Sequence, residues 1–174
     1  MIDVGNCGEV GYIRDMEETL PPQTEEGAGF ESTRVRQFTV FLPNKVGRLQ
    51  MLLRTLEETD SKIVALSLEE SADSTLVRMI CSEPDIARHA MIEHGFPLNE
   101  SDLLAVELPR DEGQPLIAIC TALLAAEINI HYAYPLLLRP RGPVVALYVD
   151  DPTLSARLLM RKGFRLIGES DLRT

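Results

Sequence analysis

Residues 38–49, with the sequence FTVFLPNKVGRL, decide the fold, because they join a strand pattern to a helix pattern through a glycine-containing turn. Apolar side chains alternate at Phe38, Val40 and Leu42, which predicts a half-buried strand. Further along, leucines recur at the spacing of a buried helix face, and they are Leu49, Leu52, Leu53 and Leu56. The stretch therefore predicts a strand, a turn at residues 43–47 and a helix, in that order.

The second half of the chain repeats this order. Leu42-Pro43 followed by Gly47 returns as Leu108-Pro109 followed by Gly113, a shift of 66 residues. The string Glu100-Ser101-Asp102-Leu103 returns verbatim as Glu169-Ser170-Asp171-Leu172, a shift of 69 residues. A slowly growing shift is expected where the second copy carries small insertions in its loops. The ordered series of matches predicts an internal duplication.

Each copy predicts the same six elements. The middle pair of strands is expected over residues 63–69 and 76–81 in the first copy and over 128–138 and 144–149 in the second. The first helix of the second copy is expected to bury Leu116, Ile119, Cys120 and Leu123. Second helices are expected to begin at Pro84 and Pro152 and to end at Gly95 and Gly163. Residues 96–99 and 164–167 are expected to close the copies as short strands.

This element order predicts an α+β fold of two ferredoxin-like βαββαβ repeats, in which each four-stranded antiparallel sheet carries two helices on one face. Residues 36–174 resemble a tandem pair of ACT domains, the small-molecule-sensing modules of amino-acid metabolism. The segments that carry the resemblance are residues 41–49, 63–68, 102–109 and 127–134. We expect an acidic irregular arm over residues 1–35, a first ACT repeat over 36–101 and a second over 102–174.

The loop before the first helix is the candidate ligand site. The first amides of a helix have no partners within it, and with the helix dipole they favour a carboxylate. Gly47 allows a ligand to approach the backbone closely, and Lys45 would add positive charge unless it is only a solvated surface residue. The resemblance implies that the ligand's ammonium group is bound by Asn44 or by a strand of a paired module. The expected site residues are Asn44, Lys45, Val46, Gly47, Arg48 and Leu49. A turn that merely reverses the chain is the alternative.

The corresponding loop of the second copy offers Gly113 and Gln114 as site residues. Asp111 and Glu112 precede them, and two carboxylates repel an incoming carboxylate. We therefore expect the first loop to be the better site. The usual loop proline of the family is Val46 here, so this turn is less rigid.

Charge and hydropathy exclude several classes of function. The net charge is −10 over 174 residues, and residues 1–33 hold eight acids and one base. A negative field repels phosphate, so nucleic acids and anionic membranes are not expected partners. The longest uncharged apolar stretch, residues 116–126, has 11 residues and is too short to span a bilayer. With no signal-peptide pattern, the expected location is cytoplasmic.

The acidic N-terminal stretch is expected to form an irregular arm because it holds little periodic apolar pattern. Tyr12, Ile13 and Phe30 are the side chains that would dock it onto the body of the protein. A solvated arm is the alternative.

No catalytic residues, metal ligands or cofactors are predicted. His89 and His94 are five residues apart, which does not place them on one helix face, and His131 is expected as a half-buried strand residue. The three cysteines form no C-x-x-C motif and are expected to be reduced thiols in apolar space; they are Cys7, Cys81 and Cys120. The RNA-recognition motif shares the element order, but residues 75–81 lack the exposed aromatics that it uses to bind bases.

The resemblance implies a non-catalytic regulatory protein that binds an amino acid between ACT modules. A branched-chain amino acid and an acetolactate-synthase-like biosynthetic enzyme are the ligand and partner that it suggests. Unpaired sheet edges also predict a homodimer or an intramolecular eight-stranded sheet. The alternative is a ligand-free ACT adaptor that acts on a partner enzyme.

Overall fold

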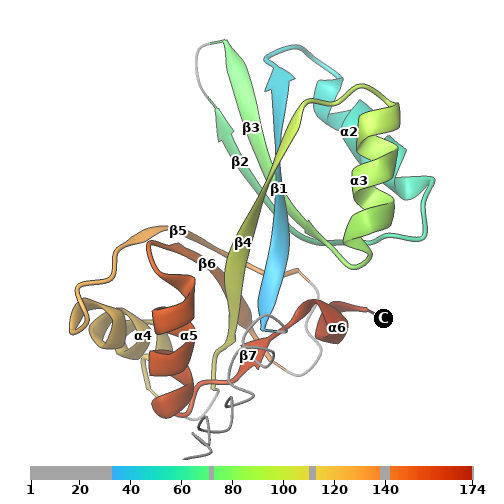
Figure 1. Ribbon diagram of the computed structural model, residues 1–174. Coiled ribbons are helices and arrows are strands. Elements are labelled where there is room, and N and C mark those ends of the chain that lie inside the picture. The colour runs from blue at the N-terminus through green and yellow to red at the C-terminus, as the bar shows by residue number, and fades with distance from the viewer. Residues whose placement is uncertain (1–32, 71–72, 110–112, 138–141, 174) are drawn as a thin grey trace, which may run out of the picture.

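The computed structural model describes residues 33–70, 73–109, 113–137 and 142–173. The elements alternate as two βαββαβ repeats followed by a short helix (Figure 1). In chain order they are β1 (Arg34–Pro43), α2 (Arg48–Glu57), β2 (Ile63–Glu70), β3 (Ser74–Cys81), α3 (Pro84–Glu93), β4 (Leu98–Glu107), α4 (Pro115–Leu124), β5 (Ile130–Pro135), β6 (Val144–Val149), α5 (Pro152–Arg161), β7 (Leu166–Ile167) and α6 (Glu169–Leu172). The tandem ferredoxin-like fold class is therefore confirmed.

A single strand, β4, belongs to both repeats. The sheet has the order β2-β3-β1-β4-β6-β5, with β7 also paired to β4. Residues 98–104 of β4 pair with β1, and residues 104–107 pair with β6. The strand expected over residues 96–99 and the first strand of the second repeat are thus one strand, since no glycine or proline interrupts its sequence LNESDLLAVE.

Sharing β4 replaces the two expected four-stranded sheets with one seven-stranded sheet. The expected boundary between residues 101 and 102 falls inside β4, and the division into an arm and two repeats stays a prediction. The part of the arm before residue 33 lies outside the described residues.

Two buried hydrophobic clusters fill the space between the helices and the sheet. Helices α2 and α3 cover one face of β1, β2 and β3, and α4 and α5 cover β4 and β6 (Figure 1). Side chains that alternate along the strands enter these clusters, including Phe38, Val40 and Leu42 from β1 and Leu104 and Val106 from β4. The alternation read from the sequence at Phe38, Val40 and Leu42 is therefore confirmed.

A third cluster lies on the opposite face and takes residues from all seven strands, among them Val35, Leu103 and Val144. The Leu137 N–H, just after β5, donates a hydrogen bond of 2.7 Å to the Val64 carbonyl of β2. Since β2 and β5 are the two ends of the strand order, the sheet curls until its ends meet around this cluster.

The predicted ends of the second helices are confirmed. Helices α3 and α5 begin at Pro84 and Pro152, and the glycines that follow them have left-handed backbone angles, with φ of 73° at Gly95 and 88° at Gly163. The end of α4 lacks such a glycine, and Glu127 takes the left-handed conformation with φ of 56°.

The predicted buried face of α4 is wrong at two of its four positions. Ile119 and Leu123 are buried, but Leu116 is 49% exposed and Cys120 is exposed. The reason is that α4 is apolar on every side, so periodicity does not identify which side meets the sheet. The expectation of a buried thiol is correct for Cys81 only, and Cys7 lies outside the described residues.

The duplicated tetrapeptide adopts two different structures. Glu100 to Leu103 form part of β4, whereas Glu169 to Leu172 form α6. Both glutamates nevertheless pair with Arg36, at 3.8 Å for Glu100 and 3.3 Å for Glu169. Helix α6 therefore attaches the end of the second repeat to the first strand of the first.

Candidate functional site

The loop from β1 to α2 presents a helix N-terminus with no side-chain cap. Gly47 is the N-cap residue of α2, with φ of 87° and ψ of −12°. Within the described residues, no side chain accepts a hydrogen bond from the first-turn amides. The Arg48 N–H donates to the Lys45 carbonyl at 3.2 Å, which leaves the amides of Leu49 and Gln50 to an anionic group.

A row of paired residues brings the end of β2 to this loop. Leu42 of β1 pairs with Thr75 of β3, and Thr75 pairs with Glu70 of β2. The C-terminal ends of β1 and β2 thus lie at the same end of the sheet, on either side of the beginning of β3. A pocket of about 380 Å³ opens there, lined by Leu42, Pro43, Asn44, Lys45, Gly47, Arg48, Leu49, Leu68, Glu70 and Thr75.

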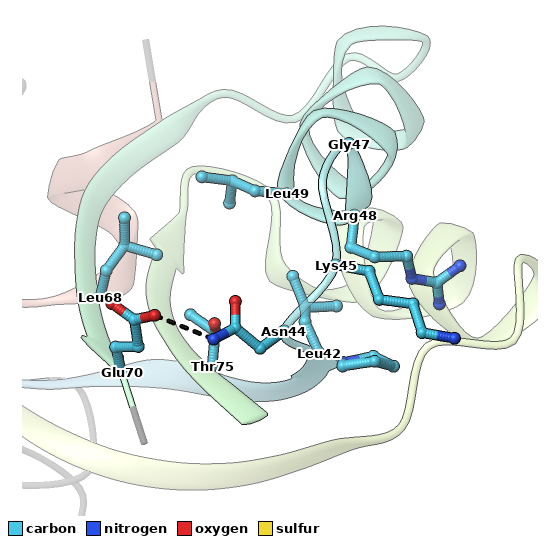
Figure 2. Close-up of a pocket in the computed structure, with 10 residues that line it drawn as sticks. Leu42, Asn44, Lys45, Gly47, Arg48, Leu49, Leu68, Glu70 and Thr75 are labelled. Carbon is cyan, nitrogen blue, oxygen red and sulfur yellow. Dashed lines mark hydrogen bonds between the residues drawn. The ribbon is translucent and has the colours of Figure 1, made fainter. Parts of the chain in front are cut away.

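One hydrogen bond joins two polar residues that line the pocket. Asn44 Nδ2 donates to Glu70 Oε1 at 2.9 Å (Figure 2). This bond leaves the other Glu70 oxygen and the Asn44 carbonyl oxygen as acceptors, which suits an ammonium group. Leu68, which is 51% exposed, belongs to the apolar part of the wall together with Leu42, Pro43 and Leu49.

The two cationic side chains of the loop lie on its other side. Lys45 and Arg48 point away from Glu70, whereas Asn44 points toward it (Figure 2). The Arg48 guanidinium lies 5.8 Å from the centre of the Phe96 ring, and its buried Nε has no hydrogen-bond partner among the described residues. Positive charge therefore lies next to the amides of α2 and not beside the Glu70 carboxylate.

The structure brings together five of the eight predicted site residues. Five line the pocket, namely Asn44, Lys45, Gly47, Arg48 and Leu49. Val46 is fully exposed and is not among the lining residues. Gly113 and Gln114 precede α4 in the second repeat and do not line this pocket either.

Sequence reasoning missed the far wall of the pocket, which is Leu68, Glu70 and Thr75. The signal that could have found it is topological. In a βαββ unit with strand order 2-3-1, the third strand lies between the first two and runs antiparallel to both. The first two strands therefore finish at the same end of the sheet, and a charged residue at the end of the second strand lies near the loop after the first.

The second loop differs from the first in its backbone. Gln114 is the N-cap residue of α4, with φ of −122°, and its side chain makes no capping bond. Gly113 is exposed and does not have the left-handed angle of Gly47. Asp111 and Glu112, whose repulsion we predicted, lie outside the described residues.

Two other reactive side chains, His131 and Cys81, are respectively paired and buried. His131, expected half-buried, is exposed, and its Nε2 lies 2.6 Å from Asp150 Oδ1. Burial raises the pKa of the Cys81 thiol to about 12, against the opposing effect of a hydrogen bond with Ser61. In the described part of the chain, no group of three or more metal-binding side chains occurs. No helix within the same ranges is long and apolar enough to cross a membrane.

Solved structures share this fold. Protein BT0572 from Bacteroides thetaiotaomicron is 27% identical to this chain, with a TM-score of 0.75, over 82% of this chain and 97% of that one. The regulatory subunit of aspartate kinase from Thermus thermophilus, in its ligand-free form, is 11% identical with a TM-score of 0.51, over 73% and 91%. The aspartokinase alpha and beta subunits are 15% identical with a TM-score of 0.50, over 75% and 92%.

A search of curated protein sequences found no significant match. A family model described as an ACT domain pair matches residues 33–174. This match covers both βαββαβ repeats and the strand that they share. The chain therefore belongs to the family of ACT domain pairs.

Proposed function

We propose that this protein is a non-catalytic regulatory protein that binds an amino acid in the pocket beside α2. The observation that carries the proposal is the opposed polarity of the pocket. Uncapped helix amides lie on one side, and the Glu70 carboxylate, held by Asn44, lies on the other. An α-amino acid carries a carboxylate and an ammonium group on the same carbon, so one molecule offers a partner to each side.

The apolar wall indicates the class of side chain. Leu42, Leu49 and Leu68 all line the pocket. An aliphatic side chain would bury apolar surface there, at about 25 cal/mol for each Å² removed from water. A branched-chain amino acid fits this wall better than an acidic one.

The proposal includes a homodimer and a regulated partner. The pocket opens beside the end of the edge strand β2, where Leu68 is half exposed. A strand from a second copy would cover this edge and enclose the ligand. A biosynthetic enzyme of the amino-acid pathway, acetolactate-synthase-like in class, is the proposed partner, in the cytoplasm. The regulatory subunit of aspartate kinase, which shares this fold, supports a regulatory role.

A thermal-shift panel of the twenty amino acids tests the binding proposal. A ligand at a hundredfold excess over its Kd stabilises the protein by about 2.7 kcal/mol. We expect leucine, isoleucine or valine to raise the melting temperature most. The matched 2-oxo acid, which lacks the ammonium group, and the matched amine, which lacks the carboxylate, should both fail. A panel with no stabilising amino acid would favour the ligand-free adaptor.

A further inference from the structure

Helix α4 (Pro115–Leu124) contains no charged residue, although much of it lies at the surface. Leu116, Ile117 and Leu124 are 49%, 61% and 75% exposed. A helix that is apolar on all sides is normally buried. The corresponding helix of the first repeat, α2, carries Arg48 and Arg54. The second repeat therefore presents an apolar helix face that the first repeat lacks.

A groove of about 460 Å³ lies between α4 and α5, and small residues of α4 line it rather than these three exposed side chains. Its lining is apolar apart from one threonine and one lysine, and consists of Ala118, Thr121, Ala122, Ala125, Ala126, Leu158, Lys162 and Phe164. The alanines leave room for larger side chains from another segment. The groove is thus shaped for apolar side chains.

The rim of the groove is basic. Lys162, which lines the groove, and the preceding Arg161 are both exposed. The acids near these helices stand at their ends, with Asp151 capping the start of α5 and Glu127 following α4. An apolar groove with a basic rim fits a segment that is acidic and carries apolar side chains.

The N-terminal arm has this composition. Residues 1–32 contain eight acids and one base, and between residues 10 and 20 they carry the apolar side chains Val10, Tyr12, Ile13, Met16 and Leu20. The arm joins the described chain beside α5, because Arg34 Nη2 donates to Thr153 Oγ1 at 2.8 Å. Thirteen residues of extended chain reach about 45 Å, and a helix of ten residues is about 15 Å long. The arm is long enough to lie along the groove.

We propose that the acidic arm, residues 1–32, docks the apolar side chains of residues 10–20 into the groove between α4 and α5. Its carboxylates lie against the basic rim, and its apolar side chains cover α4. A second copy of the chain is the competing occupant of the same face.

Two native thiols test this proposal in the full chain. Cys7 belongs to the arm, Cys120 is exposed on α4, and Cys81 is buried and unreactive. A short bismaleimide should cross-link Cys7 to Cys120. An equal mixture of ¹⁵N-labelled and unlabelled protein, digested and analysed by mass spectrometry, distinguishes a link within one chain from a link between two. We expect the link within one chain.

Charge reversal distinguishes docking from chance encounters of a tethered arm. The double variant Arg161→Glu, Lys162→Glu should lower the cross-link yield at least threefold. The control Arg54→Glu, Lys62→Glu makes the same charge change in the first repeat and should leave the cross-link yield unchanged. Equal yields in the two double variants, or a wild-type yield of zero with both thiols reactive, would overturn the proposal. Links found only between labelled and unlabelled chains would assign the groove to a second copy.

Discussion

Asn44 Nδ2 lies 2.9 Å from Glu70 Oε1, so the loop that starts α2 is bonded to the last residue of β2. The sequence predicts Asn44 as part of the site, whereas it does not predict Glu70. It also fixes a carboxylate opposite the uncapped amides of α2. The site therefore has an anion-binding side and a cation-binding side on two different elements.

Gly47→Ala should destabilise the protein, because Gly47 has φ of 87° and no side chain favours that angle. We expect the free energy of unfolding to fall by about 1–2 kcal/mol in urea denaturation. Gly113→Ala is the matched control, since its backbone is not left-handed and a Cβ there meets nothing within 4 Å. It should be neutral or raise stability by up to about 1 kcal/mol. Equal losses in both variants would show that the backbone angle of Gly47 is not the cause.

Glu127→Gly should stabilise the protein. Glu127 is a non-glycine residue with positive φ, 56°, at the end of the first helix of the second repeat. Glycine relieves that conformation, and we expect a gain of about 1 kcal/mol in the free energy of unfolding. Glu127→Ala removes the same charge but keeps a side chain. A gain of the same size in Glu127→Ala would assign the effect to charge and contradict the backbone explanation.

Alkaline pH should weaken the fold through Cys81. Burial raises the pKa of its thiol from 9.0 to about 12. The folded state then keeps the proton where the unfolded chain loses it, so the free energy of unfolding falls as pH rises from 9.0 toward about 12. The slope contributed by one such group is at most about 1.4 kcal/mol per pH unit. Denaturation curves of Cys81→Ala should show a shallower alkaline decline than the wild type, and parallel declines would count against this assignment.

The repeat and the helix boundaries were readable from the sequence because they depend on local chemistry. Proline begins α3 and α5, and glycine follows them with a left-handed backbone, as predicted at Pro84, Pro152, Gly95 and Gly163. The alternation along β1 likewise depends only on which side chains face the core. These features need no knowledge of distant parts of the chain.

Features that depend on tertiary packing were missed. The positions of the sheet and of α5 decide which side of α4 is exposed. Because the sequence of α4 is apolar on every side, it does not indicate that side. The fusion of two strands into β4 depends on the pairing of both repeats with it. Glu70 joins the site only because β3 pairs with both β1 and β2. The same tetrapeptide forms part of β4 where it begins at Glu100 and forms α6 where it begins at Glu169. The surrounding structure therefore decides its conformation.

The central claim is that Glu70 and the start of α2 bind the two charged groups of an amino acid. Isothermal titration calorimetry of Glu70→Gln, with the amino acid that stabilises the wild type most, tests it directly. Glu69→Gln is the matched control, because Glu69 is the preceding residue of the strand and pairs with Arg78 at 2.6 Å. A hydrogen bond to a charged group contributes about 1.5–3 kcal/mol.

We predict that Glu70→Gln weakens binding at least tenfold and that Glu69→Gln leaves the Kd unchanged. Wild-type affinity in Glu70→Gln, with a native circular dichroism spectrum, would contradict the account and place the ligand elsewhere.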